Sequence, residues 1–371
     1  MTEWKEYKLG EICTKITSGG TPKTSEASYY DGNIPWLNTK EVNFNRIEKT
    51  EKYITEEGYN NSSAKWIPKG SVIIAMYGAT AAKVAYSLID LTTNQACCNL
   101  IIDNDIADSQ FVYYYIQSSY EELLNLACGA AQQNLNVGVI ANFQILLPPL
   151  EEQIRIASIL SSLDDKIDLL HRENTTLEAM AETLFRQWFI EEAKEDWEEV
   201  SLEDIAYLSA GGDKPKNVSY NRTNELNIPI YSNGIEDEGL YGYTNIPKIT
   251  EESVTISARG TIGYVVLRTE PFVPIVRLIT LTPKKNITSK YLYFWAKSQD
   301  INGTGTTQQQ LTIPDFKLTK VLLPEKELIS KFTNEVDKYY EKILLNKQQI
   351  QTLTQQRDGL LPKLMSGKVK I

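Results

Sequence analysis

Residues 150–192 of the chain read LEEQIRIASILSSLDDKIDLLHRENTTLEAMAETLFRQWFIEE. Apolar or small residues recur in this stretch at alternating steps of four and three, and a single asparagine completes the series. The series consists of Ile156, Leu160, Leu163, Ile167, Leu170, Asn174, Leu177, Ala181, Leu184 and Trp188. This spacing is typical of a coiled-coil seam, so it predicts a long helix that packs against a second one.

A stretch near the C-terminus repeats the same period in phase. The positions 176 residues further on are Phe332, Val336, Tyr339, Ile343, Asn346, Ile350, Leu353, Arg357, Leu360 and Leu364. Antiparallel packing of the two helices is expected to place Asn174 against Asn346, Ala181 against Tyr339, and Trp188 against Phe332. A buried asparagine pair of this kind fixes the register of a coiled coil at some cost in stability.

Length and composition bound the class of protein. A chain of 371 residues exceeds what one core usually spans, so two domains are expected. The four cysteines, Cys13, Cys97, Cys98 and Cys128, form neither a Cys-x-x-Cys motif nor a cluster with histidine, which predicts a reduced, cytoplasmic protein without a zinc site. The start of the chain is too polar for a signal peptide, and no apolar run approaches the roughly 18 residues of a membrane span. A soluble protein is therefore expected.

The net charge of −10 argues against a simple basic nucleic-acid binder, but the charge is unevenly distributed. Residues 151–200 contain 14 acidic and 5 basic residues, a net of −9, which leaves −1 for the rest of the chain. The acidic excess lies on the first helix and the link after it. The two globular parts can therefore carry local basic surfaces.

The part of the chain before the first helix predicts a mixed α+β domain. Residues 71–76, 84–89 and 99–102 are rich in β-forming residues and are bounded by turn signals, so they are expected to be strands. Residues 108–126 predict one helix. The proline pair Pro148-Pro149 ends a short apolar strand and marks the domain boundary.

After the first helix the sequence begins again. The matching segments are 4–12 and 197–205, 18–23 and 210–216, 33–35 and 227–229, 71–72 and 253–254, 111–115 and 291–295, 132–135 and 308–311, and 145–148 and 321–324. This internal repeat predicts one domain-plus-helix unit present twice, with domains at 1–150 and 196–325 and helices at 151–195 and 326–371. The expected fold is α+β, with two pseudo-symmetric globular domains separated by a long antiparallel two-helix coiled coil. The expected coiled coil would return the C-terminus to the first domain and span about 48 Å at ~1.5 Å per residue.

An alternative is that both helices merely cover the core of one large globule. The sustained heptad spacing favours the seam over this alternative.

The layout resembles the specificity subunit of type I restriction-modification systems. The residues that carry the resemblance are 9–12 (LGEI), Gly20-Thr21-Pro22, Ile34-Pro35-Trp36-Leu37, 147–153 (LPPLEEQ) followed by Ile156, Ala157 and Leu160, and Leu360-Leu361. Their order, repeated twice, makes the resemblance specific, and it covers nearly the whole chain. The second helix departs from the pattern, because residues 324–329 (PEKELI) lack the Glu-Gln that follows the first proline pair.

The resemblance implies a non-catalytic subunit of a DNA methyltransferase and endonuclease complex. Each of two target recognition domains would read one half of a bipartite site in double-stranded DNA. The helices would dock two methyltransferase (M) subunits, and restriction/translocase (R) subunits would join that core. S-adenosylmethionine, ATP and Mg are expected on the partner subunits, with no cofactor or metal in this chain. The sequence agrees, because it contains no Asn-Pro-Pro-Tyr motif and no Walker loop.

Candidate DNA contacts follow from side-chain chemistry. Glutamine and asparagine can donate to and accept from an adenine edge, and arginine can bond guanine with two hydrogen bonds. The polar loops that offer such groups contain Gln132, Gln133 and Asn134 in the first half, and Asn233, Gln308, Gln309 and Gln310 in the second. Tyr77 and Arg259 follow equivalent strands, and Thr21 belongs to the glycine-rich motif. Candidates for phosphate contacts are Lys23, Lys40, Lys83, Lys214, Lys216 and Arg277.

Simpler interpretations compete with some of these assignments. A glutamine-rich loop is often only a solvated turn. The glycine pairs at 19–20 and 211–212 are expected to form plain turns with positive φ rather than phosphate cradles. The aromatic clusters at 113–115 and 293–295 are expected to be core, and His171 is expected to be solvated.

Two other classes of function remain at this stage. An enzyme acting alone, such as a hydrolase with paired carboxylates, would need acidic residues in a cleft, whereas the acid here lies mainly on a helix. A non-DNA protein scaffold that holds two partners at a fixed separation would explain the repeat and the helices but not the polar loops.

Overall fold

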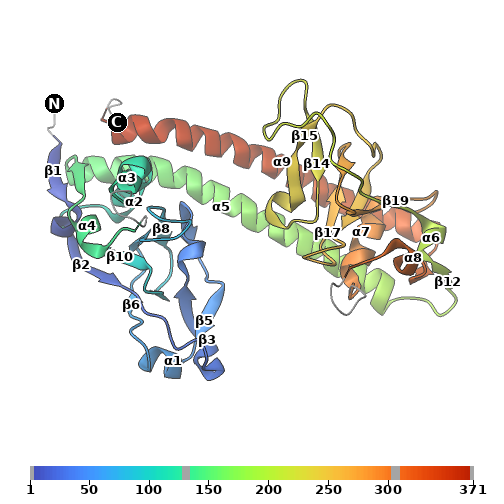
Figure 1. Ribbon diagram of the computed structural model, residues 1–371, viewed down its shortest axis with the longest axis horizontal. Coiled ribbons are helices and arrows are strands. Elements are labelled where there is room, and N and C mark those ends of the chain that lie inside the picture. Colours follow the sequence, from blue (N-terminus) through green and yellow to red (C-terminus); the bar gives the residue numbers. More distant parts are fainter. Residues whose placement is uncertain (1–3, 128–133, 302–309, 368–371) are drawn as a thin grey trace. The chain divides into compact units, whose positions relative to one another are not determined.

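The computed structural model describes residues 4–127, 134–301 and 310–367. The backbone divides into two compact units (Figure 1). Unit 1 comprises Met1–Leu169 together with Gln349–Ile371, and unit 2 comprises Leu170–Gln348. The long helices are α5 (Leu150–Arg186) and α9 (Lys326–Met365), and each of them has one segment in unit 1 and another segment in unit 2. Both stretches with coiled-coil spacing are therefore helical, as predicted.

The described strands of unit 1 form three sheets. Strand β1 (Lys5–Lys8) pairs antiparallel with β11 (Gln144–Leu147). A five-stranded sheet has the order β2-β10-β7-β8-β4, and a four-stranded sheet has the order β5-β3-β9-β6. Their bounds are β2 Cys13–Ser18, β3 Tyr30–Leu37, β4 Asn45–Ile47, β5 Lys52–Ile54, β6 Trp66–Ile67, β7 Val72–Ala75, β8 Val84–Ser87, β9 Leu91–Thr93 and β10 Cys97–Ile102. The short helices are η1 Leu9–Ile12, η2 Ala27–Tyr29, η3 Thr39–Glu41, α1 Glu56–Asn60, α2 Ser109–Ser118, α3 Tyr120–Ala127 and α4 Val137–Ala141.

The described strands of unit 2 repeat this plan. Strand β12 (Glu198–Ser201) pairs with β20 (Lys320–Leu323), a four-stranded sheet has the order β13-β19-β16-β17, and a three-stranded sheet has the order β15-β14-β18. The bounds are β13 Ala206–Ala210, β14 Ile228–Tyr231, β15 Leu240–Thr244, β16 Ser253–Ile256, β17 Val265–Arg268, β18 Val273–Pro274 and β19 Ile279–Pro283. The helical elements are η4 Gln187–Glu191, α6 Leu202–Ile205, η5 Glu236–Gly239, α7 Ser289–Ser298 and α8 Ile313–Phe316.

The strand orders of the two units confirm the internal repeat. Each unit opens with a strand that pairs with its last strand, and each has a smaller second sheet. In both central sheets four strands pair antiparallel, in the orders β2-β10-β7-β8 and β13-β19-β16-β17, and in unit 1 the edge strand β4 adds a parallel pair. The short helix after the opening strand is anchored in the same way. Leu9 N donates to Phe143 O and Leu202 N donates to Thr319 O, both at 2.9 Å. The repeat in sequence is thus a repeat of topology.

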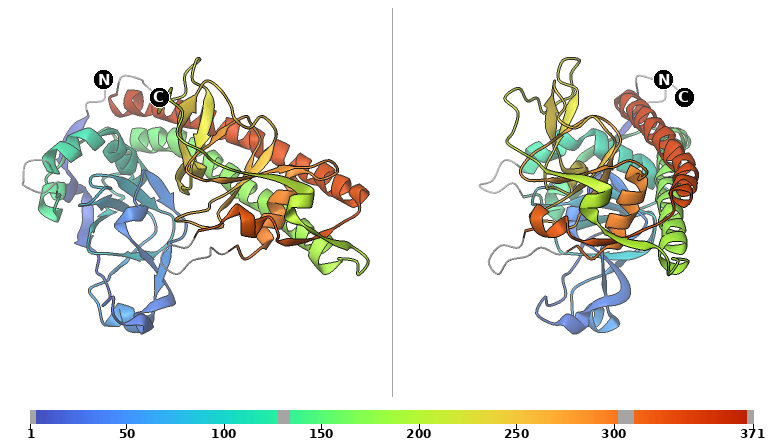
Figure 2. Two further views of the ribbon diagram at one scale, coloured as in Figure 1. Left: turned by 45° about the vertical axis from the view of Figure 1, so that its right-hand side comes forward. Right: turned by 90° about the vertical axis from the view of Figure 1, so that its right-hand side faces the viewer.

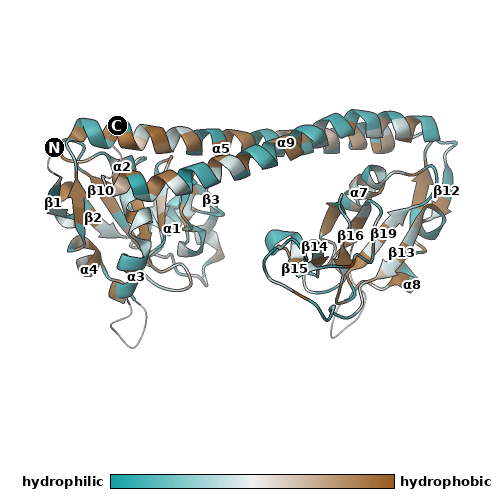
Figure 3. Cartoon of the chain, turned by 90° about the horizontal axis from the view of Figure 1, so that it is seen from above, coloured by the Kyte–Doolittle hydropathy of each residue, from teal (hydrophilic) through white to brown (hydrophobic). Residues whose placement is uncertain are grey.

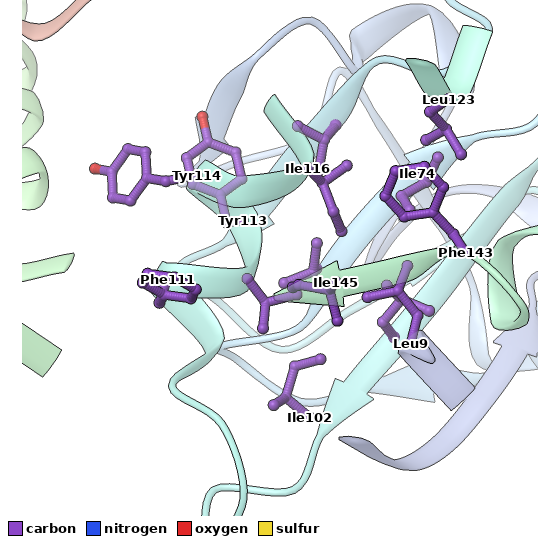
Figure 4. Close-up of a cluster of buried hydrophobic side chains, with 14 of the residues drawn as sticks. Leu9, Ile74, Ile102, Phe111, Tyr113, Tyr114, Ile116, Leu123, Phe143 and Ile145 are labelled. Atoms are coloured by element: carbon purple, nitrogen blue, oxygen red, sulfur yellow. The ribbon is translucent and has the colours of Figure 1, made fainter. Parts of the chain in front are cut away.

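The core of unit 1 lies between the central sheet, α2 and the helical segments of α5 and α9. Phe111, Tyr113 and Tyr114 of α2 are at most 2% exposed (Figure 4). Leu361 and Leu364 near the end of α9 belong to this cluster. The C-terminal helix therefore packs on the first domain, as the antiparallel arrangement predicts.

The prediction of one helix over 108–126 was wrong in its continuity. The helix is capped by Asp108, whose carboxylate accepts from Phe111 N, and it ends at Ser118. Ser119 leaves helical geometry at φ −98 and ψ 18, and α3 begins at Tyr120. Serine competes for backbone hydrogen bonds and favours helix ends, which explains a break at this pair of serines.

The core of unit 2 is aromatic. Phe185 of α5 packs against Tyr291 and Phe294 of α7 and against Phe332 of α9, with ring centroids 5.7 to 6.1 Å apart. Phe294 is 2% and Trp295 is 5% exposed. The aromatic runs at 113–115 and 293–295 are therefore largely core, as expected. Figure 3 shows hydrophobic residues on several strands of both units, whereas α5 and α9 alternate between hydrophobic and hydrophilic stretches.

The segments of α5 and α9 lie side by side within each unit (Figure 2). In unit 2, Asn346 Nδ2 donates to Asn174 Oδ1 at 2.9 Å, and the rings of Trp188 and Phe332 lie 6.3 Å apart. These contacts confirm the predicted register.

The predicted seam residues are all at least half-buried. The fully buried ones are Ile156, Leu160, Ile167, Leu170, Phe332, Val336, Ile343 and Asn346, and the half-buried ones are Leu163, Asn174, Leu177, Leu184, Tyr339, Ile350, Leu353 and Leu360. His171 is exposed, as expected. Among the described residues, no helix is both long and apolar enough to cross a membrane.

Candidate nucleic-acid interface

Several strand ends of unit 1 meet at one edge of its central sheet. Strand β10 begins at Cys97, where β7 and β2 end on either side of it, and β8 begins beside the end of β7. The connecting segments 19–23, 76–83 and 94–96 therefore lie together. Segment 38–44 joins them, because Thr80 Oγ1 donates to Thr39 O at 2.9 Å. Leu135 N donates to Met76 O at 2.8 Å and brings Asn134 to the same place. We call these segments and Asn134 the loop edge of unit 1.

Unit 2 builds an equivalent edge from equivalent strand ends. Strand β19 begins at Ile279 beside the ends of β13 and β16. The segments 211–216, 232–239, 257–264 and 275–278 meet there, and Leu311 N donates to Ala258 O at 3.0 Å, which brings in Gln310. Thr261 Oγ1 donates to Asn233 O at 3.5 Å, the counterpart of the bond between Thr80 and Thr39. We call these segments and Gln310 the loop edge of unit 2.

The glycine pairs stand at these edges for a reason other than the expected one. None of the four glycines has a positive φ, so the prediction of a left-handed turn was wrong. A Cβ on Gly19 would lie 2.1 Å from Thr93 O, and a Cβ on Gly211 would lie 2.7 Å from Ile275 N. At Gly19 and Gly211, glycine is therefore required because two backbones approach each other closely.

Three of the predicted base contacts gather at the loop edge of unit 1. Tyr77 is 37% exposed and forms an antiparallel β-bridge with the exposed Asn134. Thr21 Oγ1 donates to Gln95 Oε1 on the neighbouring turn. Gln132 and Gln133 lie outside the described residues, as do Gln308 and Gln309 of the second half.

The lysines predicted for unit 1 have polar partners. Lys23 Nζ lies 2.8 Å from Glu26, and Lys40 Nζ lies 2.9 Å from Glu51. The hydrogen bond and the charge of Glu51 raise the pKa of Lys40. Lys83 Nζ donates to Asn43 Oδ1 at 2.7 Å. Two of these three lysines are therefore paired with carboxylates.

The loop edge of unit 2 carries more open positive charge. Arg259 Nη2 donates to Gln310 Oε1 at 3.2 Å, and this pair occupies the place of Tyr77 and Asn134. Lys214, Lys216 and Arg277 are exposed, and in the described part of the chain none of these three forms a salt bridge. Lys214 Nζ lies 5.7 Å from the centre of the Tyr241 ring.

The side chain of Asn233 bonds the backbone of two neighbouring segments. Its Nδ2 donates to Val276 O and its Oδ1 accepts from Ala258 N, both at 2.7 Å. The amide therefore braces two loops of the edge. Base contact by Asn233 stays a prediction, and it would require these bonds to open.

Sequence reasoning missed a buried arginine that supports the loop edge of unit 2. Arg268 is 3% exposed, its guanidinium lies 3.5 Å from the centre of the Tyr231 ring, and its Nη2 donates to Glu238 O at 2.6 Å. Burial lowers the pKa of Arg268. Asp237 and Glu238 have φ angles of 45° and 56°, so this bond holds a turn in a conformation that L-residues rarely adopt.

Sequence reasoning also missed the polar contacts that join the first domain to the helices. Arg46 of β4 binds Asp165 at 2.7 Å and also binds Asp168 of α5. Gln153, in the Glu-Gln motif, is 1% exposed and bonds Asp108 N and Pro148 O. The corresponding position of α9 is the buried Ile329, which accounts for the departure of the second helix from that motif.

Asp164 of α5 accepts hydrogen bonds from two side chains in unit 1. Tyr114 OH lies 2.5 Å and Arg357 Nη1 of α9 lies 2.8 Å from its carboxylate oxygens. Burial and the charge of Asp164 raise the pKa of Tyr114. In the described ranges, no three His, Cys, Asp or Glu side chains gather as a metal-binding group.

Comparison with known proteins places the chain in a family. The model of the type I restriction modification DNA specificity domain matches residues 1–179 and again 194–355. The chain is 27% identical to the specificity subunit of the type I restriction enzyme MjaIX of Methanocaldococcus jannaschii, over 100% of this chain and 97% of that protein. It is 32% identical to the EcoR124I/EcoR124II specificity subunit of Escherichia coli, over 44% of this chain and 41% of that protein.

A solved structure shares the fold. The type I restriction-modification S subunit from M. genitalium matches with a TM-score of 0.59 at 20% sequence identity, over 97% of this chain and 96% of that one. Because the family model covers most of the chain in two successive matches, the chain belongs to the family of type I restriction-modification DNA specificity proteins.

Proposed function

We propose that this chain is the DNA specificity subunit of a type I restriction-modification complex, and that each unit reads one half of a bipartite site with its loop edge. The observation that carries the proposal is the construction of the same edge twice on one topology with different side chains. Tyr77 and Asn134 stand in unit 1 where Arg259 and Gln310 stand in unit 2. One scaffold with different hydrogen-bonding groups suits the recognition of two different half-sequences.

Phosphate contacts position each edge on the duplex. Lys214, Lys216 and Arg277 are exposed beside the base-reading groups of unit 2. In unit 1, Lys23 and Lys40 would exchange their carboxylate partners for phosphates when DNA binds. Such contacts carry no sequence information, but they make affinity fall as salt rises.

The surfaces of α5 and α9 are proposed to dock methyltransferase subunits. Large apolar side chains are exposed on both helices: Ile154 at 49%, Leu169 at 49%, Met180 at 46%, Leu344 at 58% and Leu345 at 61%. Exposed apolar side chains of this size on one pair of elements favour a protein interface. In this proposal residues 1–150 and 196–325 are the recognition domains. Catalysis belongs to partner subunits that bind S-adenosylmethionine, ATP and Mg.

The test is the methylation pattern made by the complex. The chain is expressed with its methyltransferase partner in cells that lack other DNA methyltransferases, and methylated positions are mapped by single-molecule sequencing. The expected result is one motif of two defined half-sequences separated by an unspecified spacer, which disappears when this chain is omitted. Methylation that is independent of the chain, or a motif with one undivided block, would overturn the proposal.

A further inference from the structure

Gln95 is an exposed side chain in a stretch that is otherwise buried. It lies on the turn between β9 and β10, and every other residue from Leu91 to Leu100 is buried. The flanking Asn94 and Ala96 are 7% and 5% exposed. Because its neighbours on the turn are buried, the long polar side chain of Gln95 is available for hydrogen bonding to a molecule outside the protein.

The turn that carries Gln95 is held on both sides. Asn94 N donates to Leu37 O at 2.9 Å, and Met76 N donates to Ala96 O at 2.8 Å. The Asn94 side chain accepts from Ala96 N at 3.2 Å and donates to Thr39 Oγ1 at 3.2 Å. The backbone at Gln95 is therefore tied to the segments that follow β3 and β7. A fixed backbone reduces the entropy that is lost when a side chain binds.

The side chain of Gln95 is oriented as well. Thr21 Oγ1 donates to Oε1, which leaves one lone pair of that oxygen. Among the described residues, no acceptor bonds the Nε2 group of Gln95. One acceptor and one donor that lie side by side on an amide match the N6 and N7 edge of adenine in the major groove.

We propose that Gln95, oriented by Thr21, reads an adenine in the half-site that unit 1 recognises. The inference rests on the proposed function, and it adds to that function one recognised base, adenine, and the residue that reads it. Gln95 shares the loop edge with Tyr77 and Asn134, since Met76 bonds both Ala96 and Leu135. It is therefore a specificity-determining residue of the same surface.

The corresponding turn of unit 2 carries different chemistry. Aligning β10 with β19 through their partners Ser18 and Ala210 places Val276 at the position of Gln95. Val276 is 50% exposed and has a φ of 52°. An apolar side chain at this place suits contact with a thymine methyl group rather than hydrogen bonding to an adenine edge. The two half-sites should therefore differ at the equivalent position.

The experiment compares Gln95→Ala, Gln95→Glu and Thr21→Val in the complex with the methyltransferase partner. Gln144→Ala serves as a matched control, because Gln144 is an exposed glutamine on β11 of the same unit. Genomic methylation is mapped by single-molecule sequencing, and rates are measured on duplexes that carry each base at every half-site position. Gel filtration of each complex shows whether it assembles.

The expected result for Gln95→Ala is a loss of discrimination of about 5- to 150-fold at one A·T pair of one half-site. Gln95→Glu should shift the preference at that position toward cytosine, whose amino group a carboxylate accepts. Thr21→Val should weaken discrimination at the same pair and at no other.

Three outcomes would overturn the inference. They are an unchanged motif, an equal loss of methylation at every site without a change of base preference, and relaxation in the half read by unit 2. If the wild-type complex makes no bipartite motif, the proposed function itself fails, which distinguishes the two failures. Gln144→Ala should leave both rate and motif unchanged.

Discussion

Replacing Arg357 with methionine should destabilise unit 1, because it leaves the carboxylate of Asp164 buried without a cation. The Asp164 side chain is 7% exposed and that of Arg357 is 18% exposed, and their contact is 2.8 Å long. Burial alone would lower the pKa of Arg357, but the hydrogen bonds and negative charges of Asp164 and Asp358 together outweigh burial and raise it. Removing one partner of a buried ion pair typically costs about 3–5 kcal/mol. Tyr114 OH still donates to Asp164, so the lower end of that range is expected.

The assay is thermal and urea unfolding of the assembled complex, followed by the fluorescence of tryptophans in unit 1. A loss of about 3 kcal/mol corresponds to roughly 6–12 °C in Tm for a unit of this size. The double variant Asp164→Leu with Arg357→Met should recover part of the loss, because apolar groups replace the ion pair, whereas the buried Tyr114 hydroxyl loses its acceptor. A single variant that loses less than about 1 kcal/mol, or a double variant as unstable as the single one, would refute the reasoning.

Other substitutions test other contacts. Asn346→Ala should cost about 1–3 kcal/mol, because the Asn174 carbonyl loses its donor in the seam, and urea midpoints would measure it. Gly19→Ala should cost about 1–3 kcal/mol in the same assay through the clash with Thr93 O, whereas alanine at the open Gly359 serves as the control. Burial raises the pKa of Cys98 to about 12. The unfolded thiol loses its proton near its ordinary value of ~8.5, so the contribution of Cys98 to stability should be constant below that pH and decline as pH rises toward 12. Cys98→Ala should show a shallower decline between pH 8 and 10.5.

Much of the architecture was predictable because it is periodic or repeated. The heptad spacing predicted α5 and α9, and the offset between the two halves predicted the pairing of Asn174 with Asn346. Neither inference required knowledge of contacts between segments of unrelated sequence. The place of Tyr77 and Arg259 on equivalent loops followed from the same repeat.

Contacts between segments far apart in the sequence were not predictable. Arg46 and Asp165 are separated by 119 positions, and no local pattern marks either as a partner of the other. Gln95 lies two positions after the three-residue strand β9, and no local pattern marks it. Its exposure is distinctive only because the fold buries the residues on both sides of it. The sequence of the glycine pair at 19–20 predicts a turn with positive φ, which is wrong, and the close approach of Thr93 that demands glycine is visible only in the fold.

The central claim is that each loop edge reads its own half of a bipartite site. Its most direct test uses two double variants, Tyr77→Ala/Asn134→Ala in unit 1 and Arg259→Ala/Gln310→Ala in unit 2, and a third variant that combines all four substitutions. Genomic methylation is mapped for each of the three variants. Unit 1 variants should relax only one half-sequence, unit 2 variants only the other, and the combined variant both, with the spacer unchanged throughout. Relaxation of both halves by either pair alone, or of neither by the combined variant, would contradict the claim.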